Sequence, residues 1–422
     1  MSRRLKILLT EGSSTSSRQA LYCLAGHKVD ILDPSPFCQS RFSRLVRRWH
    51  RCPSYTADPL AYLRFVVRML RREKYDVLLP THEQLYLLSR ARDRLLELTG
   101  LVVPDFDSLD HVMNKAKFSQ LLDELDIGQP KTEVVSSRAD LMDRATAESM
   151  PLYLKPAFGT AGRGVFLIRN QAELQDAAQF YDNAGLFDGR HQVLVQQPGV
   201  GDQEDLGGMF QHGRLIGGGG AKARMQGVGG APMGRKNLYD EHLVDEVRRI
   251  GERLNWHGPI SFGVFHNRET GRAEYIDANP RIGETVMPML CGSNPCETMV
   301  QMSLGHRVES APRPEIHVRT HQGFLILLSK VLSGEGRLSL LREIWRQWRR
   351  GGFYAGSEDE LTRPREDWMS LVPAAAVTAL LLALPRAANW LVNRTVANYS
   401  LSSDAADRIY QLTDAELESC FR

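Results

Sequence analysis

The feature that most constrains the fold is a glycine-rich stretch at residues 155–165, which directly follows a short apolar run at 152–154. The apolar run predicts a strand, and the first residue after it is a lysine. The three glycines of the stretch allow the backbone to turn so that its N–H groups point at an anion. The sequence therefore predicts a loop that can fold over a triphosphate.

A second stretch, residues 275–281, reads Tyr-Ile-Asp-Ala-Asn-Pro-Arg. Its alternation has the period of a strand, so the carboxylate of Asp277 and the amide oxygen of Asn279 leave the same face. Hard oxygen ligands placed in this way suit Mg²⁺. We therefore expect a metal-binding pair at the end of this strand.

The size and composition are those of a multidomain globular protein. The chain has 422 residues, of which 42% are hydrophobic and 24% charged, and its formal net charge is +3. A chain of this length corresponds to two or three domains. Arginines cluster at residues 41–51 and 64–74, a pattern that can attract nucleic acid or anionic lipid but is more often a solvated helical face. We expect no nucleic-acid partner.

The cysteines and the N-terminus indicate the compartment. The six cysteines show neither C-x-x-C pairs nor metal-ligand spacing, which favours a reducing environment. The N-terminus is basic and then apolar, but its apolar run is too short for a signal peptide and predicts a first β-strand at residues 6–9. We therefore expect a cytoplasmic protein.

The order of elements predicts an α/β unit, an α+β unit and a helical region. Residues 1–110 alternate short apolar strands with helical stretches, which indicates βαβ units and a parallel sheet. Residues 111–310 mix helices and strands in an α+β pattern, and a proline-rich stretch at 311–314 marks the boundary. Residues 311–422 are predicted to be mainly helical.

Two C-terminal stretches allow two interpretations. In residues 338–350, leucines and tryptophans recur at helical spacing with arginines around the turn, as in a helix on an anionic membrane surface or in a packed surface helix. Residues 368–390 hold an apolar run that is shorter than the roughly 20 residues needed to cross a bilayer. We favour a buried core helix over peripheral contact with the inner membrane face, because short apolar runs in long soluble chains are usually core.

Taken in order, Lys115, Lys155 with its glycine loop, the strand-like residues 193–196 and the Asp-x-Asn-Pro-Arg motif at 277–281 resemble the ATP-grasp superfamily. The resemblance runs from about residue 5 to 305, and is nearest to the carbamoyl-phosphate-synthase-like and carboligase branches. It implies an α/β, Rossmann-like pre-ATP-grasp domain, an α+β ATP-grasp domain and a mainly helical C-terminal extension.

The resemblance also implies which residues bind ATP. The two lysines would contact the α- and β-phosphates as point charges. The strand near 193–197 would read the adenine edge through its backbone, and one of two acids after it would bind the ribose. The residues implied to bind ATP are Lys115, Lys155, Gly159, Thr160, Gly162, Arg163, Gly164, Gln196, Gln197, Val200, Glu204 and Asp205.

Metal ligands and catalytic cations follow from the same resemblance. Asp277 and Asn279 would hold Mg²⁺, or Mn²⁺ in its place. Lys222, Arg224 and Arg281 would neutralise an acyl phosphate as it forms, which is the electrostatic part of catalysis.

One position departs from the family pattern. In the family, an acid or a glutamine on the preceding strand shares the metals with the carboxylate of the Asn-Pro-Arg motif, and Gly263 falls at that position. Glycine has no side chain that could ligate a metal. Either water replaces the ligand, which Mg²⁺ tolerates, or a metal is lost and turnover is slow or absent. Glu284 could compensate or could form a salt bridge.

On this resemblance we expect an ATP- and Mg²⁺-dependent ligase that joins a small-molecule carboxylate to an amine, or to a thiol, through an acyl phosphate. A carboxylase-like activity on bicarbonate is a second hypothesis, although the chain has neither a second ATP-grasp half nor a biotin-accepting segment. The non-enzymatic alternative is a nucleotide-binding regulatory or membrane-associated protein with weak or no turnover. A homo-oligomer is compatible with each of these.

Overall fold

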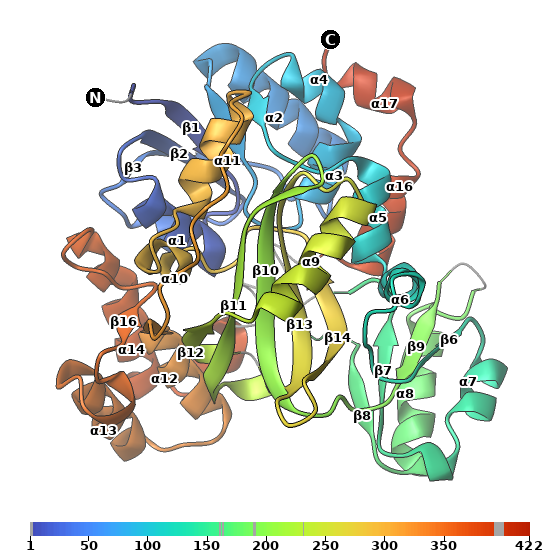
Figure 1. The fold of residues 1–422 in the computed structure, drawn as a ribbon. Coiled ribbons are helices and arrows are strands. Elements are labelled where there is room, and N and C mark those ends of the chain that lie inside the picture. The colour runs from blue at the N-terminus through green and yellow to red at the C-terminus, as the bar shows by residue number, and fades with distance from the viewer. Residues whose placement is uncertain (1–2, 160–161, 163, 189–190, 231, 392–400) are drawn as a thin grey trace.

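The computed structural model describes residues 3–422, apart from 160–161, 163, 189–190, 231 and 392–400. Its described strands form three sheets. Figure 1 shows a parallel sheet near the N-terminus, a long sheet through the centre of the molecule and a small sheet at the lower right. The C-terminal helices α12 to α14 lie at the lower left, and α16 and α17 return to the top.

The N-terminal sheet is parallel, as the βαβ pattern predicts. Its strands, in the order β3-β2-β1-β4-β5, are β1 (Lys6–Leu9), β2 (Lys28–Asp33), β3 (Val46–Arg51), β4 (Val77–Leu79) and β5 (Gly100–Leu101). The helices of this region are α1 (Thr15–Cys23), α2 (Pro59–Glu73), α3 (Leu85–Arg90) and α4 (Arg92–Leu96). The central strand β1 is buried at Ile7, Leu8 and Leu9, so both faces of the sheet are covered.

The first arginine cluster is partly an edge strand and not a solvated helical face. Residues 46–51 form β3, in parallel register with β2. Arg47 donates to both carboxylate oxygens of the buried Asp30, at 2.7 and 2.6 Å. Burial acts to raise the pKa of Asp30, but the hydrogen bonds from Arg47, His50 and Tyr75 outweigh it and hold the pKa below its usual value. The second cluster lies on α2 and in the residue that ends it, as predicted.

A small antiparallel sheet carries the predicted glycine loop. In the order β6-β9-β7-β8, its strands are β6 (Thr132–Val135), β9 (Val193–Gln196), β7 (Leu152–Pro156) and β8 (Phe166–Ile168). Helices α7 (Arg138–Arg144) and α8 (Gln171–Asn183) pack on it, and Leu141, Leu154, Leu174 and Tyr181 form a core of its own. Helices α5 (Phe106–Met113) and α6 (Lys115–Glu124) lead into this sheet.

The central sheet carries the Asp-x-Asn-Pro-Arg motif. Its strands, in the order β14-β13-β10-β11-β12-β15-β16, are β14 (Arg272–Asn279), β13 (Gly258–Asn267), β10 (Asp202–Gln211), β11 (Arg214–Gln226), β12 (Pro232–Leu238), β15 (Arg319–His321) and β16 (Glu358–Asp359). Helix α9 (Glu241–Arg253) packs on one face, with Val247 and Ile250 in the same core as Phe210. The close packing of α9 on Phe210 requires a glycine at 251, because a Cβ there would lie 2.0 Å from a ring carbon of Phe210. The opposite face is left for the candidate site.

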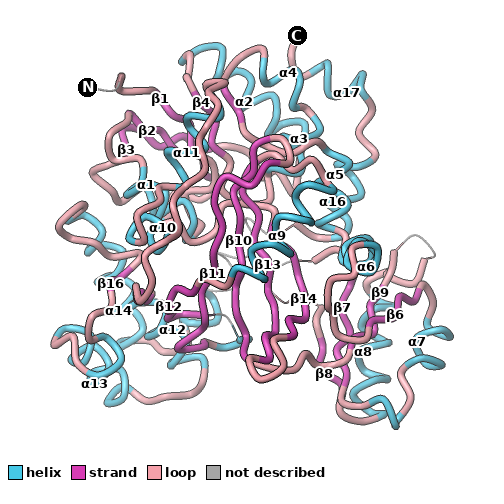
Figure 2. Tube along the Cα trace, in the orientation of Figure 1, coloured by secondary structure: helices cyan, strands magenta, loops and turns pink. Residues whose placement is uncertain are grey.

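The C-terminal region is mostly helix and loop, as Figure 2 shows at the lower left. Helices α10 (Val286–Leu290) and α11 (Pro295–Ser303) precede it, and it comprises α12 (Gly323–Leu332), α13 (Arg337–Trp348), α14 (Leu371–Ala383), α16 (Ser403–Tyr410) and α17 (Asp414–Ser419). Strands β15 and β16 also come from this region. The central sheet therefore extends past the boundary expected at residue 310.

The last helices bind to the N-terminal part of the chain. The backbone N–H of Leu401 donates to Glu83 Oε2 at 2.6 Å, and Arg408 donates to the carbonyl of Thr56. Ser403 Oγ donates to the carbonyl of Phe158, at the start of the glycine loop, at 3.2 Å. Within the described ranges, no helix is both long enough and apolar enough to cross a membrane.

Candidate active site

Lys155 lies near the end of β7 and is buried. Its Nζ donates to Oε1 of Gln196 on the neighbouring strand β9 at 2.6 Å, and Gln196 donates in turn to Thr132 Oγ1 at 2.8 Å. Burial lowers the pKa of Lys155 to about 8; the charge of Asp277 acts against burial, and that of Lys115 acts with it. A cation that is short of solvent and beside a second cation favours an anionic partner.

The glycine loop turns sharply after β7. Gly162 and Gly164 both have φ of +70°, in the left-handed region that glycine adopts without strain. Thr160 and Arg163, two of the residues implied to bind ATP, lie outside the described residues. Gly159 accepts a hydrogen bond through its carbonyl, so at this point the loop is fixed by a side chain from another element.

That side chain is Lys115, the first residue of α6. Its Nζ donates to the Gly159 carbonyl at 2.8 Å and lies 3.5 Å from Oδ1 of Asp277. Its backbone N–H donates to the carbonyl of Ala157 at 2.9 Å. The glycine loop, α6 and β14 therefore meet at one lysine, and the two stretches singled out in the sequence lie together in space.

The end of β14 presents oxygen atoms and a guanidinium. Asn279 Oδ1 accepts a hydrogen bond from Arg281 Nη1 at 2.5 Å, and Gly263 pairs directly with Asp277 across the strands. Among the described residues, no group of three or more His, Cys, Asp or Glu side chains is placed to hold a metal ion. One carboxylate and one amide fit Mg²⁺, which takes one or two protein ligands and completes its shell with water and phosphate oxygens.

The residues after β9 are partly engaged. The backbone N–H of Gln197 donates to the carbonyl of Lys131 at 2.9 Å, and its Nε2 donates to the carbonyl of Ser149 at 2.9 Å. The backbone N–H of Val200 donates to Glu274 Oε2 at 3.0 Å, while its side chain is exposed. A role for Gln196, Gln197 and Val200 at the adenine stays a prediction.

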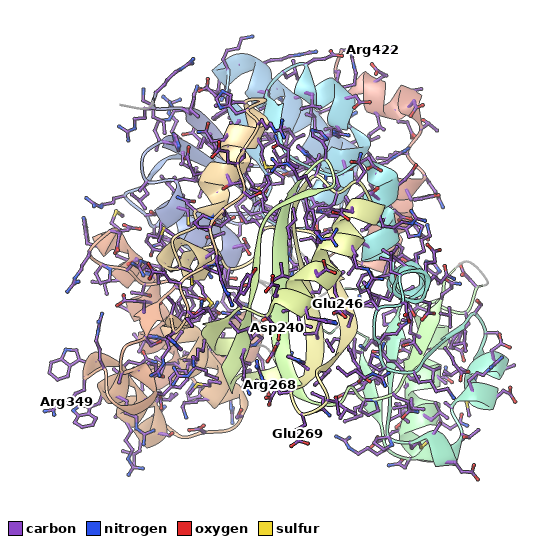
Figure 3. The ribbon with its side chains drawn as sticks, viewed as in Figure 1. Asp240, Glu246, Arg268, Glu269, Arg349 and Arg422 are labelled. Carbon is purple, nitrogen blue, oxygen red and sulfur yellow. The ribbon has the colours of Figure 1, made fainter. Side chains whose placement is uncertain are left out.

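The two candidate ribose acids lie on opposite faces of β10, because neighbouring residues of a strand alternate. Glu204 is buried, accepts from Arg268, and lies 3.2 Å from Nδ1 of His266. Figure 3 shows Arg268 at the outer end of the β13–β14 hairpin. Asp205 points the other way and lines the cavity described next. Only Asp205 therefore shares a face with the rest of the site.

Lys222 and Arg224 are not brought to Arg281. Lys222 forms an ion pair with Asp202, the first residue of β10. Arg224 donates to the Phe353 carbonyl at 3.4 Å and stacks on the Phe353 ring. Lys222 stands opposite Glu204 in the β10–β11 register, on the face away from Asp205, and in the described residues no ion pair joins it or Arg224 to Asp277. Their catalytic role stays a prediction that the geometry does not favour.

A different cation, Arg235 on β12, faces the site. Buried Arg235 forms ion pairs with Glu284 at 2.9 Å and with Glu360 at 3.0 Å. Sequence reasoning missed this residue, although its odd position on β12 would place it on the same face as Asp205 once the register of β10, β11 and β12 is known. Glu284, considered as a metal ligand or a salt-bridge partner, is in the salt bridge.

Asp205, Arg235 and Glu284 line one cavity of about 560 Å³. Arg235, Arg281, Asp205, Asn279 and Glu284 contribute its polar wall. Glycines make much of its floor, because Gly207 pairs with Gly219 and Gly217 pairs with Met209 on the face that Asp205 shares. The apolar walls are Met209, Met233, Met287, Pro312, Pro314 and Leu325. The site can therefore hold a partly apolar molecule against bare backbone, next to both signs of charge.

A buried cluster at the N-terminal sheet borders the cavity through His82. His82 and Glu83 follow β4, and Glu11 follows β1, its neighbour at the point where strand order reverses, which is where open α/β sheets bind ligands. Arg281 Nη1 lies 3.9 Å from Glu83 Oε1, and His82 Nδ1 lies 3.8 Å from Glu11 Oε2. Sequence reasoning gave no role to Glu11, His82 or Glu83.

Glu11 is a strained and strongly perturbed acid. It is 4% exposed, has φ of +54°, and its two carboxylate oxygens make no hydrogen bond with any described residue. Burial raises the pKa of Glu11 well above its usual value; Glu83 and Asp33 add to the effect and Arg281 opposes it. Burial, with Arg281, lowers the pKa of His82 well below its usual value. The cluster therefore favours a protonated Glu11 and a neutral His82.

Replacing Glu11 with glutamine is expected to change how stability depends on pH. The raised pKa means that the folded wild type holds a proton which the unfolded chain has lost, so its free energy of unfolding falls as pH rises above the ordinary pKa of glutamate. The slope from this one group is at most about 1.4 kcal/mol per pH unit. Glu11→Gln should remove that slope, measured as the difference in thermal midpoint between variant and wild type from pH 5 to 8.

Glu269→Gln is the matched control, because Glu269 lies in the exposed hairpin between β13 and β14 (Figure 3). Its difference from wild type should stay constant with pH. A Glu11→Gln difference that is equally constant would show that Glu11 is not held protonated.

Comparison with known proteins places the fold. No model of a known protein family matches the chain. It is similar to the structure of an L-amino acid ligase from Bacillus licheniformis, with 19% identity, a TM-score of 0.57, and coverage of 75% of this chain and 79% of that one. It is also similar to the biotin carboxylase domain of a Hydrogenobacter thermophilus 2-oxoglutarate carboxylase, solved with MgADP and bicarbonate, with 14% identity, a TM-score of 0.59, and coverage of 75% and 74%.

A third similar structure is the ADP complex of PurK, the N5-carboxyaminoimidazole ribonucleotide synthetase, with 14% identity, a TM-score of 0.59, and coverage of 82% of this chain and 87% of that one. All three are ATP-grasp enzymes. The chain therefore has the ATP-grasp fold, which the resemblance of its motifs predicted. At 14–19% identity the similarity establishes the fold, and the three proteins act on different molecules.

Proposed function

We propose that this protein is an ATP- and Mg²⁺-dependent ligase that joins a small carboxylate to an amine through an acyl phosphate. The observation that carries the proposal is the convergence of Lys115, Lys155 and Asp277 beside the glycine loop, at a site that continues past Arg281 into the cavity. Two lysines and a glycine loop suit phosphates. The cavity beyond them has room for two small substrates.

In the first step, a carboxylate oxygen of the substrate attacks the γ-phosphorus of ATP in line. The bond between that phosphorus and the bridging oxygen breaks, and ADP leaves. Lys115 and Lys155 would hold the charge on the nucleotide, and Arg281, steadied by Asn279, would neutralise the acyl phosphate as it forms. When bound between Asp277 and Asn279, Mg²⁺ would supply further positive charge to the phosphate oxygens.

In the second step, the amine attacks the acyl carbon, a C–N bond forms, the C–O bond to phosphate breaks, and the nitrogen loses a proton. Asp205 lies in the cavity, and burial raises its pKa to about 6, while Arg235 lowers it and Glu284 raises it further. A carboxylate with a pKa near neutrality is suited to accept that proton. Asp205 and Glu284 also attract an ammonium group and not a thiol, so we favour an amine as the acceptor.

The test is phosphate release by the full chain with ATP, Mg²⁺ and panels of carboxylates and amines, with the products identified by mass spectrometry. Release that requires both an acid and an amine, with a condensed product, supports ligation. Release that requires bicarbonate would indicate carboxylation instead. The absence of any heat when MgATP is titrated into the protein would overturn the proposal altogether.

Nucleotide binding without turnover is the second candidate function, and one observation favours it. Gly263 pairs with Asp277 at the position where a second metal ligand would stand, and it contributes no side chain. A metal held by fewer protein atoms would be held more weakly and less precisely. Binding of MgATP without phosphate release in any substrate panel would support this regulatory function.

Replacing Gly263 with glutamate is expected to strengthen metal binding. A Cβ at this position would meet only the Ile276 side chain, at 3.5 Å, which is ordinary contact, so the strand can accept a larger residue. The Mg²⁺ concentration at half-maximal ATP binding should fall by about tenfold, the lower end of the effect of ligand-sphere changes. Gly263→Ala controls for the backbone, and equal Mg²⁺ dependence in both variants would show that this position does not face the metal.

A further inference from the structure

Helix α13 exposes an apolar face to solvent. Leu338, Leu341, Trp345 and Trp348 follow each other at intervals of three, four and three residues, so they form one line along the helix. They are 72%, 50%, 56% and 78% exposed. The other side of the helix is apolar too, because Leu340 packs with Leu327 and Leu381 in a small core. Soluble helices bury their apolar stripe, and this one has a second stripe left over.

The exposed face of α13 is also strongly cationic. Residues 337–350 contain five arginines and one glutamate, a net charge of +4, whereas the whole chain carries +3. Arg349 stacks on Trp345, with 5.0 Å from its guanidinium carbon to the ring centroid, and Figure 3 shows it at the outer edge of the molecule. Arg342 is exposed, and within the described ranges no hydrogen bond or ion pair engages it.

Helix α14 adds a second exposed apolar surface to the same region. The sequence favours a buried core helix here, but only Leu381 of α14 is buried, and Leu371 and Val372 are exposed. Trp368, just before it, is 60% exposed. Arg337 joins the two helices, because its guanidinium donates to the carbonyls of Leu382 and Ala383 at the end of α14, at 2.8 and 3.0 Å.

We propose that α13, with α14 beside it, docks this protein on the surface of an anionic lipid bilayer. Tryptophan, leucine and arginine on one helical face match the bilayer boundary, where indole rings lie at headgroup depth and arginines meet lipid phosphates. The helices have 12 and 13 residues, so each is about 18–20 Å long and shorter than the roughly 30 Å apolar core. Contact is therefore with the surface of the membrane.

Charge decides between lipid and a second copy of the chain. In a two-fold contact through α13, the arginines of one copy would face those of the other, and like charges across an interface are unfavourable. An anionic bilayer offers the opposite charge together with an apolar layer of the right depth. Each arginine near such a surface strengthens binding by about fivefold.

The experiment is cosedimentation of the full chain with phosphatidylcholine vesicles and with vesicles that also contain phosphatidylglycerol. We expect the protein to pellet with the anionic vesicles alone, to be released by salt, and to show a blue shift of tryptophan fluorescence on binding. Arg342→Glu with Arg349→Glu should weaken binding by about 30-fold or more, from two lost contacts of this size. Trp345→Ser with Trp348→Ser should abolish it.

Two substitutions elsewhere on the surface are matched controls. Phe37→Ser removes a side chain that is 77% exposed, and Arg64→Glu reverses an exposed charge on α2. Both should bind vesicles like the wild type. The fluorescence shift is measured on the unaltered protein, so it decides the matter even if a variant unfolds.

Three results would overturn the proposal. The first is that the protein neither pellets with anionic vesicles nor shows a fluorescence shift with them. The second is equal pelleting with neutral vesicles, and the third is a dimer in solution that the tryptophan substitutions dissociate. ATP turnover is measured separately, so failure of the lipid proposal leaves the proposed ligase intact, and the reverse also holds.

Discussion

Lys155→Met is expected to lower ATP turnover by about 100- to 1,000-fold, the usual effect of removing one preorganised group from a developing charge. Among the described residues, the side chain of Lys155 donates to Gln196 and lies beside Lys115, so its charge serves the site more than the packing. Methionine has a similar length and keeps the buried stem. Turnover and the dissociation constant of MgATP are the measurements.

The same variant has a distinctive pH signature. The pKa of Lys155 is about 8, so above that pH the free protein loses the proton that attracts phosphate. Affinity for MgATP should therefore fall as pH rises through 8 in the wild type, and this dependence should be absent in Lys155→Met. Lys131→Met, an exposed lysine beside β6, is the control. If Lys155→Met kept full affinity and turnover, Lys155 would not be part of the nucleotide site.

Asp277→Asn is expected to lower turnover by at least about 100-fold, because it removes the one carboxylate among the two groups proposed to hold Mg²⁺. Asparagine keeps the shape and a weaker oxygen ligand, so the loss should be partly recovered at high Mg²⁺ concentration. The measurement is turnover against Mg²⁺ concentration. Asp93→Asn, on an exposed turn of α4, should behave as the wild type does.

Asp277 also supports Lys155, because its charge raises the pKa of that lysine. In Asp277→Asn, the loss of MgATP affinity with rising pH should therefore begin at a lower pH than in the wild type. If turnover fell but the pH at which affinity weakens stayed the same, the two side chains would act separately and the shared site would be wrong.

The motifs predicted from sequence meet in space because they depend on local features. The glycine loop after a strand and the period-two pattern at 275–281 can be recognised without knowing how the elements pack. Lys115, Lys155 and Asp277 lie close together, as expected. The parallel N-terminal sheet also follows from alternating apolar strands and helices. These parts of the fold could be predicted from the chain alone.

Features that depend on the register of the strands could not be predicted from the sequence. Glu204 and Asp205 are neighbours in sequence, and only the pairing of β10 with β11 and β13 shows that Asp205 faces the cavity. Arg235 reaches the same face through β12, two strands away from β10. Lys222 follows a glycine run, as the resemblance requires, yet pairs with Asp202.

Two further misses have tertiary causes. The arginines of β3 lie on an edge strand because Asp30, buried in β2, needs a partner, and no local pattern shows that need. Helix α14 is apolar enough to be core, but Leu381 is its one buried residue, and Leu371 and Val372 are exposed.

Strands β15 and β16 have one more consequence. They attach residues 311–422 to the central sheet, and Pro312, Pro314 and Leu325 from that region wall the cavity on the side away from the glycine loop. Part of the wall that would select what is joined is thus encoded apart from the residues proposed to bind the nucleotide. Relatives that differ mainly after residue 310 would then share one reaction and differ in which substrates they accept.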